Sequence, residues 1–466
     1  MMSRMIRTGW IAVIVWTVIL TGVGGAQEVG APLTLEESIA IALRQSVAVR
    51  SAREGVSAAE ARRKEAFTAF LPKLSTSYNY TRLNEDPFVR LAPPMGAVIT
   101  GTENNHTWSL DARQPLFTGG RVTANYDIQR LGVDASRHEE LGVVQDIVLE
   151  VKRSYYTILK AKRLVGVAKQ SVEQLEAQRD LAKSFYEVGI VPRNDYLQAE
   201  VRLADGMQGL VRAENRLLEA RARFNTVLRR PIDAPADVED ILDYSPDERP
   251  FEQCLKTALE NRPEIRLYAA RVEQAEKRVK VVESEFYPSL NVVGSYQRYG
   301  DSPDLSGSKY RDPENWSVAA VATWDLWEWG RTKYARDATL SQEKQARNAL
   351  EGVRDQVALE VKNAWLAVRE AEKLIAVTET STEQAEENYR INQERFREQV
   401  SRMTDVLDAL TLLTVARASR SNALSDYRIA QAALERAMGV IWKEEAGQRA
   451  AGDRSQVQGG DHEREK

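Results

Sequence analysis

The sequence contains an internal duplication, which limits the possible folds more than any other feature of its 466 residues. Residues 35–82 resemble residues 251–298, and the segment 116–121 (LFTGGR) matches 326–331 (LWEWGR). The period of about 210 residues is far longer than a solenoid repeat, so it indicates a duplicated domain with pseudo-twofold symmetry. Each copy is predicted to run helix, strand, strand, long helix, helix.

Composition between and beyond the copies predicts the domain boundaries. The first copy is expected at 27–230 and the second at 251–443, joined by a linker at 231–250 that is rich in Pro and Asp. Residues 444–466 are rich in Gly, Gln and charged residues, and this composition predicts a disordered tail.

Residues 1–26 are typical of a secretory signal peptide. Arg4 and Arg7 precede an apolar run, and Gly24, Gly25 and Ala26 supply the small residues that signal peptidase requires. The alternative is a membrane anchor, but the apolar run is short for a span of about 20 residues. No later stretch is apolar over about 18 residues, so entry into a membrane is expected to use strands.

Two proline-free stretches, 122–188 and 332–398, carry apolar residues at alternating steps of four and three. As helices they would each be about 100 Å long at 1.5 Å per residue, and such a seam needs a partner helix along its whole length. The shorter helical stretches 34–70 and 193–229 together match one long helix in length. We therefore expect two short helices stacked against one long helix in each half.

Four segments of about ten residues alternate polar side chains with apolar or aromatic ones, as strands with one polar face do. They are 73–82, 106–117, 289–299 and 315–325. Ten residues is the length of a tilted strand that crosses a bilayer. The predicted lipid-facing side chains are Tyr78, Tyr80, Trp108, Leu110, Leu290, Val292, Tyr296, Trp316, Val318 and Trp324.

Four strands cannot close a membrane barrel, and lipid does not tolerate an open edge. Several chains must therefore pool their strands, and three chains would give twelve. The alternative is a pair of half-buried hairpins in a soluble sheet. Residues 83–105 and 300–314 are expected to be outward loops. Trp327 and Trp329 are expected either at the inner lipid interface or in the core.

Taken in order, these elements resemble the TolC-like outer membrane efflux protein family, also called outer membrane factors. The resemblance rests on the duplicated layout, on the segment 33–43 (LTLEESIAIAL), on Pro72 and Pro288 before their strands, on the LFTGGR turn, and on 405–409 (DVLDA). It covers nearly all of the chain after the predicted signal peptide.

The resemblance implies a mainly α chain with a transmembrane β-barrel. It implies a homotrimer with a twelve-stranded barrel in the outer membrane of a Gram-negative bacterium and a twelve-helix periplasmic tunnel. The implied function is a passive exit duct of a tripartite efflux or type I secretion system. The implied partners are a periplasmic adaptor (membrane fusion) protein, an inner-membrane pump or ABC exporter, and outer-membrane lipid.

The resemblance also places a pore gate at Asp405 and Asp408, near the periplasmic end. Residues three apart lie on the same helix face, so both carboxylates are able to point into one narrow pore, where three copies would attract cations. The alternative for Asp405 is a role as an N-terminal helix cap, where aspartate is favoured in any case.

The two turns between helices are the expected docking tips for the adaptor. Gln399 occupies the place of the glycine that the first turn has, and Arg402 is one residue away from the arginine of some family members. The expected contact residues are Gly189, Val191, Pro192, Asn194, Asp195, Val400, Ser401, Arg402 and Thr404.

No catalytic constellation stands out, so we expect no enzyme, no cofactor and no metal site. The three histidines are scattered over a predicted strand, a helix and the tail. The net charge of −4 is small for this length and argues against nucleic-acid binding. The competing prediction from a different class is a soluble periplasmic coiled-coil scaffold or adaptor.

Overall fold

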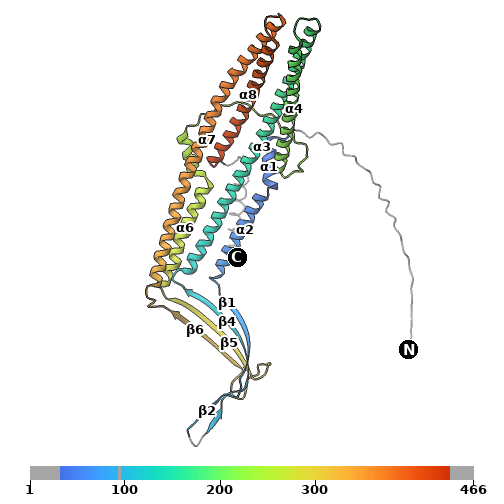
Figure 1. The fold of residues 1–466 in the computed structure, drawn as a ribbon. Helices are drawn as coiled ribbons and strands as arrows, with labels where there is room; N and C mark the ends of the chain where they lie inside the picture. The colour runs from blue at the N-terminus through green and yellow to red at the C-terminus, as the bar shows by residue number, and fades with distance from the viewer. Residues whose placement is uncertain (1–31, 93–95, 441–466) are drawn as a thin grey trace, which may run out of the picture.

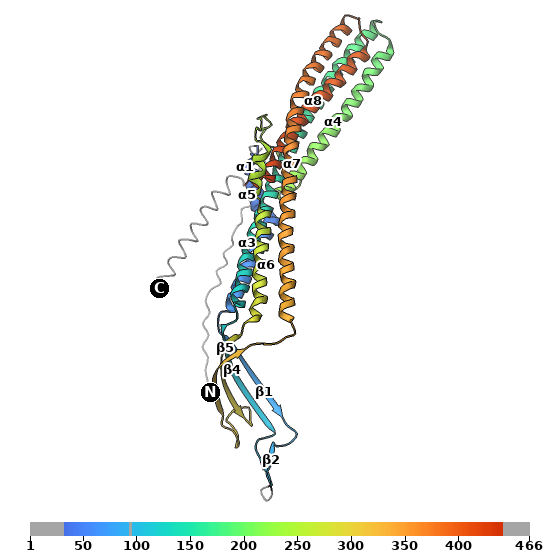
Figure 2. The same cartoon turned by 90° about the vertical axis from the view of Figure 1, so that its left-hand side faces the viewer.

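The computed structural model describes residues 32–92 and 96–440. Within them the chain is mainly helical, which confirms the predicted helical class. The molecule is long and narrow, with helical hairpins at one end and a sheet at the other (Figure 1, Figure 2). The predicted signal peptide at 1–26 and the predicted tail at 444–466 lie outside the described residues.

Two helices of 67 residues set the long axis, α3 (Arg121–Glu187) and α7 (Arg331–Arg397). Each turns back into a helix of 35 residues, α4 (Arg193–Val227) after α3 and α8 (Met403–Ala437) after α7. The short helices pack along the half of each long helix that lies away from the sheet (Figure 1). No described helix holds an apolar stretch long enough to cross a membrane.

The apolar seams of the long helices form the core. On α3, Val151 and Tyr155 are fully buried, and on α7, Val361 is fully buried. Burial at steps of four and three keeps one face of each long helix against its shorter partners, as the sequence pattern predicts.

The half of each long helix nearer the sheet packs against a broken helix. The sequence predicts one unbroken helix over 34–70, but the structure holds α1 (Leu35–Gln45) and α2 (Val47–Thr68). Ser46 adopts φ −59° and ψ 126°, which ends α1, and its Oγ accepts a hydrogen bond from the N–H of Val49 at 3.3 Å, which caps α2. The capping serine thus divides the predicted helix into two.

The second half breaks its helix at the matching place. Here α5 (Phe251–Asn261) ends at Arg262, and α6 (Pro263–Glu283) begins with a proline, which is favoured at a first helical position. A short 3-10 helix, η1 (Ser284–Phe286), then leads into the sheet.

Four antiparallel strands form one sheet in the order β1-β4-β5-β6. They are β1 (Lys73–Arg82), β4 (Asn104–Phe117), β5 (Ser289–Gly300) and β6 (Glu314–Thr323). The two middle strands come from different halves of the sequence, so the pairing of β4 with β5 joins the halves. Strands β1 and β6 are the edges.

The register puts side chains of one kind in rows across the sheet. Leu110 pairs with Tyr296, and Tyr296 pairs with Trp316, so three predicted lipid-facing residues lie side by side. Ser77 pairs with Ser109 on the polar face. The alternation along the strands therefore gives the sheet one face rich in apolar side chains. The opposite face is polar on β1 and β4, and on β5 and β6 it also carries Val293, Ala319 and Val321.

The segment predicted as an outward loop at 83–105 holds more structure than expected. Strands β2 (Phe88–Arg90) and β3 (Ala97–Ile99) pair as a short hairpin that projects beyond the sheet (Figure 1). These strands have three residues each, too few for an alternation pattern to predict them.

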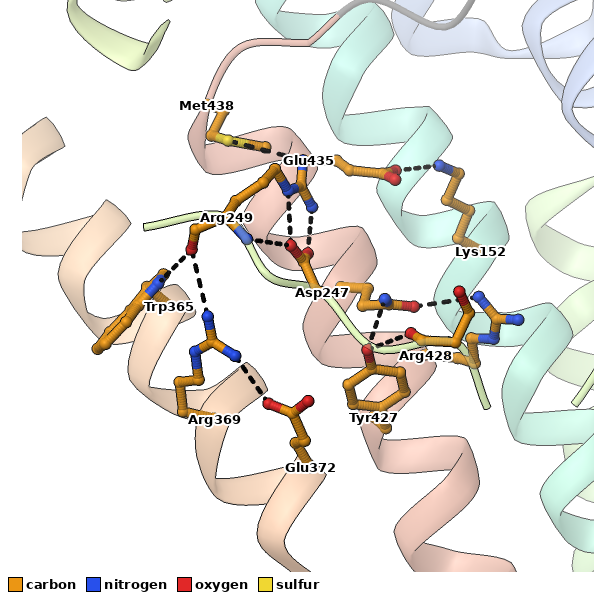
Figure 3. Close-up of polar contacts among 12 residues, drawn as sticks. Lys152, Asp247, Arg249, Trp365, Arg369, Glu372, Tyr427, Arg428, Glu435 and Met438 are labelled. Atoms are coloured by element: carbon orange, nitrogen blue, oxygen red, sulfur yellow. Dashed lines mark hydrogen bonds and ion pairs between the residues drawn. The ribbon is translucent and has the colours of Figure 1, made fainter. Parts of the chain in front are cut away.

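The linker at 231–250 contains no helix, but it is fixed to both halves. Tyr155 Oη on α3 donates to the carbonyl of Glu239 at 2.9 Å, and Tyr427 Oη on α8 donates to the carbonyl of Ser245 at 2.6 Å. Nearer α5, the carbonyl of Arg249 accepts a hydrogen bond from Trp365 Nε1 at 3.1 Å (Figure 3). The linker therefore acts as a strap across the middle of the molecule.

Candidate gate, docking tips and membrane face

Each long helix ends in a tight turn at the end of the molecule away from the sheet (Figure 1). In the first turn, the N–H of Ile190 donates to the carbonyl of Phe185 at 2.8 Å, and the N–H of Gly189 donates to the carbonyl of Tyr186 at 3.0 Å. The second turn repeats both bonds at 395–400. This is the Schellman pattern, which places the residue after the helix cap in the left-handed region.

The left-handed position holds Gly189 in the first turn, with φ +77°, and Gln399 in the second, with φ +62°. Left-handed backbone costs an L-residue with a side chain about 1–2 kcal/mol. The second turn keeps its shape although glutamine stands in the place of glycine, because the same two backbone hydrogen bonds close it.

Asp405 lies in the first turn of α8, and its Oδ2 accepts a hydrogen bond from the N–H of Arg402 at 3.0 Å. This contact satisfies a backbone donor at the helix start, and the negative carboxylate is stabilised by the positive end of the helix dipole. Arg402 occupies the N-cap position itself, and Asp405 contributes to the capping as the third residue of the helix. The Asp405 side chain is also exposed, so it is accessible from solvent.

Asp408 lies on the same exposed face of α8 as Asp405, while Val406 and Leu407 between them are buried. Its Oδ1 lies 3.3 Å from Nη2 of Arg202 on α4. This ion pair ties one hairpin to the other near the tips. Sequence reasoning missed Arg202, because nothing in the sequence indicates which arginine on the other hairpin lies opposite.

A core under the turns holds the two hairpins together. Met403 is fully buried, and the rings of Phe185 and Phe396 stack with centroids 5.6 Å apart. Gln178, which is 1% exposed, donates from Nε2 to Tyr389 Oη at 3.0 Å and so joins α3 to α7. Separating the hairpins would expose this core.

The expected docking residues all lie at or beside the two turns. Gly189, Pro192, Asn194, Val400 and Arg402 are exposed. The remaining four are partly buried, and they are Val191, Asp195, Ser401 and Thr404. Two exposed apolar side chains accompany them, Val188 and Ile190, which the sequence analysis did not include.

Nine of the ten expected lipid-facing residues share one face of the sheet, and the tenth, Trp324, directly follows β6. Six of them are exposed, and they are Tyr78, Tyr80, Leu110, Trp316, Val318 and Trp324. The other four, Trp108, Leu290, Val292 and Tyr296, are partly buried by neighbours on the same face. For example, the rings of Trp108 and Tyr296 meet edge to face at 6.0 Å.

Trp327 and Trp329 lie between β6 and α7, where the sheet meets the helices. They are 75% and 85% exposed, so they are not core residues of the single chain. Trp324, nearby, donates from Nε1 to the carbonyl of Phe286 at 3.2 Å. Exposed tryptophans at the junction of sheet and helices favour a position at the inner lipid interface over a position in the core.

These parts define a class of protein. A sheet with an apolar face and two free edges suits a membrane once its edges are paired, and long helical hairpins extend from one end of it. This is the build of a channel-forming outer-membrane protein with a helical extension. The profile of the outer membrane efflux protein family matches residues 39–228 and again 254–440, so the chain belongs to that family.

Two curated proteins are similar to this chain over most of their length, and one of them is named as an outer membrane efflux protein. The chain is 23% identical over 367 residues to outer membrane efflux protein BepC of Brucella suis, covering 78% of this chain and 75% of the relative. It is 22% identical over 407 residues to nodulation protein T of Rhizobium leguminosarum, covering 85% and 83%.

Two solved outer-membrane proteins show the same fold, and CmeC is described as an outer membrane channel. The chain resembles CmeC of Campylobacter jejuni with a TM-score of 0.74 at 16% identity, covering 93% of this chain and 94% of that one. It resembles VceC of Vibrio cholerae with a TM-score of 0.74 at 16% identity, covering 87% and 96%.

The chain is therefore an exit duct of the outer membrane of a Gram-negative bacterium. The alternative of a soluble scaffold or adaptor is not favoured by these matches. Within the described residues, no group of three or more metal-ligating side chains comes together.

Proposed function

We propose that three copies assemble into a homotrimeric duct with a twelve-stranded barrel and a twelve-helix periplasmic tunnel. In this proposal, residues 27–230 and 251–443 are the two halves of a duplicated domain around the linker at 231–250. The duct is passive and carries no catalytic activity and no cofactor. It serves a tripartite efflux or type I secretion system, in which a periplasmic adaptor and an inner-membrane pump or ABC exporter supply the energy.

The edge strands carry the proposal. Every residue of β1 and of β6 is exposed in the single chain, whereas the middle strands are partly covered. An unpaired edge is not tolerated in lipid. Strands β1 and β6 have ten residues each and run in opposite directions, so β6 of one copy fits antiparallel against β1 of the next. Repeating this contact closes a ring.

The helices support the same assembly. Apolar side chains stay exposed along α4 at Val201, Val211 and Leu218. A second exposed row follows α7 at Leu359 and Leu366. Rows of this kind along helices need a partner helix. Neighbouring copies in a helical tunnel would supply it.

The gate is assigned to the tips, where Asp405 and Asp408 would form rings of carboxylates around the pore axis. The ion pair between Arg202 and Asp408 and the core around Met403 hold the hairpins together in one chain. Adaptor contact at the exposed turn residues would move one hairpin against the other and widen the entrance.

Cross-linking between edge strands tests the assembly. In a single chain β1 and β6 are three strand spacings apart, about 14 Å, which is too far for a disulfide. We expect Ser77→Cys, combined in turn with Asn315→Cys, Ser317→Cys and Ala319→Cys, to give a covalent trimer at one register. The natural Cys254 is fully buried and should not react.

Pairs of cysteines on the same edge, such as Ser75→Cys with Ser77→Cys, are the matched control and should give no ladder. A chain that stays monomeric in detergent, with no cross-link at any of the three registers, would refute the ring.

A further inference from the structure

A hollow opens where the sheet meets the helices, and positive side chains line it. It measures about 1110 Å³ and lies between the end of α2, the starts of β1 and α3, and the end of β4. Its charged lining consists of Arg62, Lys73, Arg113 and Arg121 with one acid, Glu65. We call these four cations and their surroundings the basic hollow.

The basic hollow lies on the polar face of the sheet. Lys73 and Arg113 occupy odd positions of their strands, on the same face as Ser77 and Ser109. The neighbouring Leu74 points to the other face and is 69% exposed there. In a barrel with its apolar face toward lipid, the hollow therefore faces the lumen.

Two of the cations stand directly opposite each other. Lys73 is the cross-strand partner of Arg113 in the ladder between β1 and β4. Side chains in such a pair lie about 5 Å apart at Cβ, and like charges at this position destabilise a sheet. The fold alone therefore gives no reason for this pair.

The second half of the sequence provides an internal comparison. The duplication aligns Lys73 with Ser289 and Arg113 with Thr323, and these two residues are again direct cross-strand partners, between β5 and β6. The same position in the ladder is thus built with two neutral hydroxyl side chains. The cations are not needed to form the strand pair.

Nothing in the described part of the chain neutralises the four cations by an ion pair. Arg113 donates from Nε to the neutral Asn291 Oδ1 at 3.3 Å. The next acid on the polar face of β4, Asp111, accepts hydrogen bonds from Ser109 at 2.9 Å and Ser295 at 2.7 Å. Glu65 is the only acid in the lining, so the hollow keeps a net positive charge.

We propose that the basic hollow is an anion-binding station on the transport path, which takes carboxylate or phosphate groups of molecules passing from the helical tunnel into the barrel. The inference rests on the proposed function, because only the assembled duct makes the polar face a lumen. A concave surface of one charge raises the local concentration of opposite ions by about tenfold or more. Arginine adds paired donors that match carboxylate and phosphate oxygens.

The experiment compares ion selectivity of the full-length trimer in planar bilayers. The test variant is Lys73→Ser/Arg113→Thr, which installs the residues of the second copy and should keep the strand pair. The matched control is Arg63→Gln/Lys64→Gln, which removes two charges from α2 outside the hollow. In a KCl gradient, we expect the chloride-to-potassium permeability ratio to fall about tenfold in the test variant and to stay unchanged in the control.

Tripolyphosphate serves as the probe for binding. We expect it to block current through the wild type and the control, and to block the test variant far more weakly. The difference should vanish at about 1 M salt, where the Debye length is about 3 Å.

The outcomes separate the two proposals. A test variant that conducts like the wild type with the same selectivity and the same block overturns the anion station and leaves the duct intact. Absence of block in the wild type also overturns the station. Absence of any channel in the wild type would instead refute the proposed function.

Discussion

Left-handed backbone positions recur in both halves with different residues. At three matched places, one half has glycine and the other has a larger residue, and the pairs are Gly189 with Gln399, Gly119 with Trp329, and Gly439 with Arg229. At the helix ends the same backbone hydrogen bonds close the turn in both halves. The hydrogen bonds therefore set the conformation, and the side chain only changes its cost.

Replacing Gln399 by glycine should stabilise the second tip. Glycine adopts φ +62° without the steric cost of a side chain, so Gln399→Gly should raise the free energy of local opening by about 1 kcal/mol. Hydrogen exchange of the amides at 399 and 400 measures this opening. The control Glu398→Gly, at φ −82°, should not slow exchange. Equal or faster exchange in Gln399→Gly would contradict the prediction.

The charge of the proposed gate residue Asp408 and its contact with Arg202 can be tested separately. Arg202→Gln and Asp408→Asn each remove the ion pair between hairpins, so both should raise the open fraction of single channels. Only Asp408→Asn also removes a carboxylate, so only that variant should lower the preference for cations. Because the pair is exposed, it contributes about 0–1 kcal/mol, and thermal stability should change little.

Asp405→Asn completes the set. Asparagine keeps an oxygen for the N–H of Arg402, so the cap is retained while the charge is lost. A weaker cation preference in this variant would therefore be caused by the lost charge and not by a lost capping hydrogen bond. An unchanged open fraction in both Arg202→Gln and Asp408→Asn would show that their ion pair does not control channel opening.

At the scale of elements, the linker shows how an irregular segment becomes fixed. Its backbone accepts hydrogen bonds from buried tyrosines of both halves, Tyr155 and Tyr427. Arg428 forms an ion pair with Asp243 of the linker, and Asp247 and Arg249 pair within it (Figure 3). A stretch rich in Pro and Asp therefore has one conformation because the helices supply its partners.

The contact between Tyr427 and the linker makes the stability of the protein depend on pH. Burial, and then the carboxylates of Glu372 and Asp247, raise the pKa of Tyr427 to about 12, above its ordinary value near 10. The folded chain favours the neutral phenol, so this stability is complete below about pH 10 and is lost as the pH rises through about 12.

Tyr427→Phe should lower stability at neutral pH by about 1 kcal/mol, because the carbonyl of Ser245 loses its donor. It should also weaken the fall of the melting temperature between about pH 10 and 12. Melting of the detergent-solubilised protein measures both effects, with the exposed Tyr186→Phe as the control. A variant with the wild-type alkaline profile would show that Tyr427 does not cause it.

At the scale of the whole molecule, the chain places opposite charges at the two ends of the proposed helical tunnel. Asp405 and Asp408 lie at the tips, and the basic hollow lies beside the sheet. The 67 residues of α7 separate these regions by about 100 Å, far beyond the Debye length of about 8 Å at physiological salt.

Charge changes at the two ends should therefore shift selectivity in opposite directions and independently. Asp405→Asn/Asp408→Asn should move the reversal potential toward anions, and Lys73→Ser/Arg113→Thr toward cations. The four-fold variant should show the sum of the two shifts, because distant sites act additively. A combined shift that departs clearly from this sum would mean that one region alone limits the current.

The sequence by itself determined the periodic parts of this protein. Steps of four and three predicted the long helices, alternation predicted four strands, and β1 spans the expected 73–82. These patterns are visible because burial acts on every turn of a helix and on every second residue of a strand. The duplicated layout and the short motifs together indicated the family, and its profile matches the chain twice.

Only the tertiary structure decided the contacts between distant segments. The break at Ser46, the short hairpin of β2 and β3, the pairing of Arg202 with Asp408, and the opposition of Lys73 and Arg113 depend on which elements lie side by side. A side chain on a long helix has many possible partners in another part of the chain. Packing selects one of them, and no local pattern in the sequence records that choice.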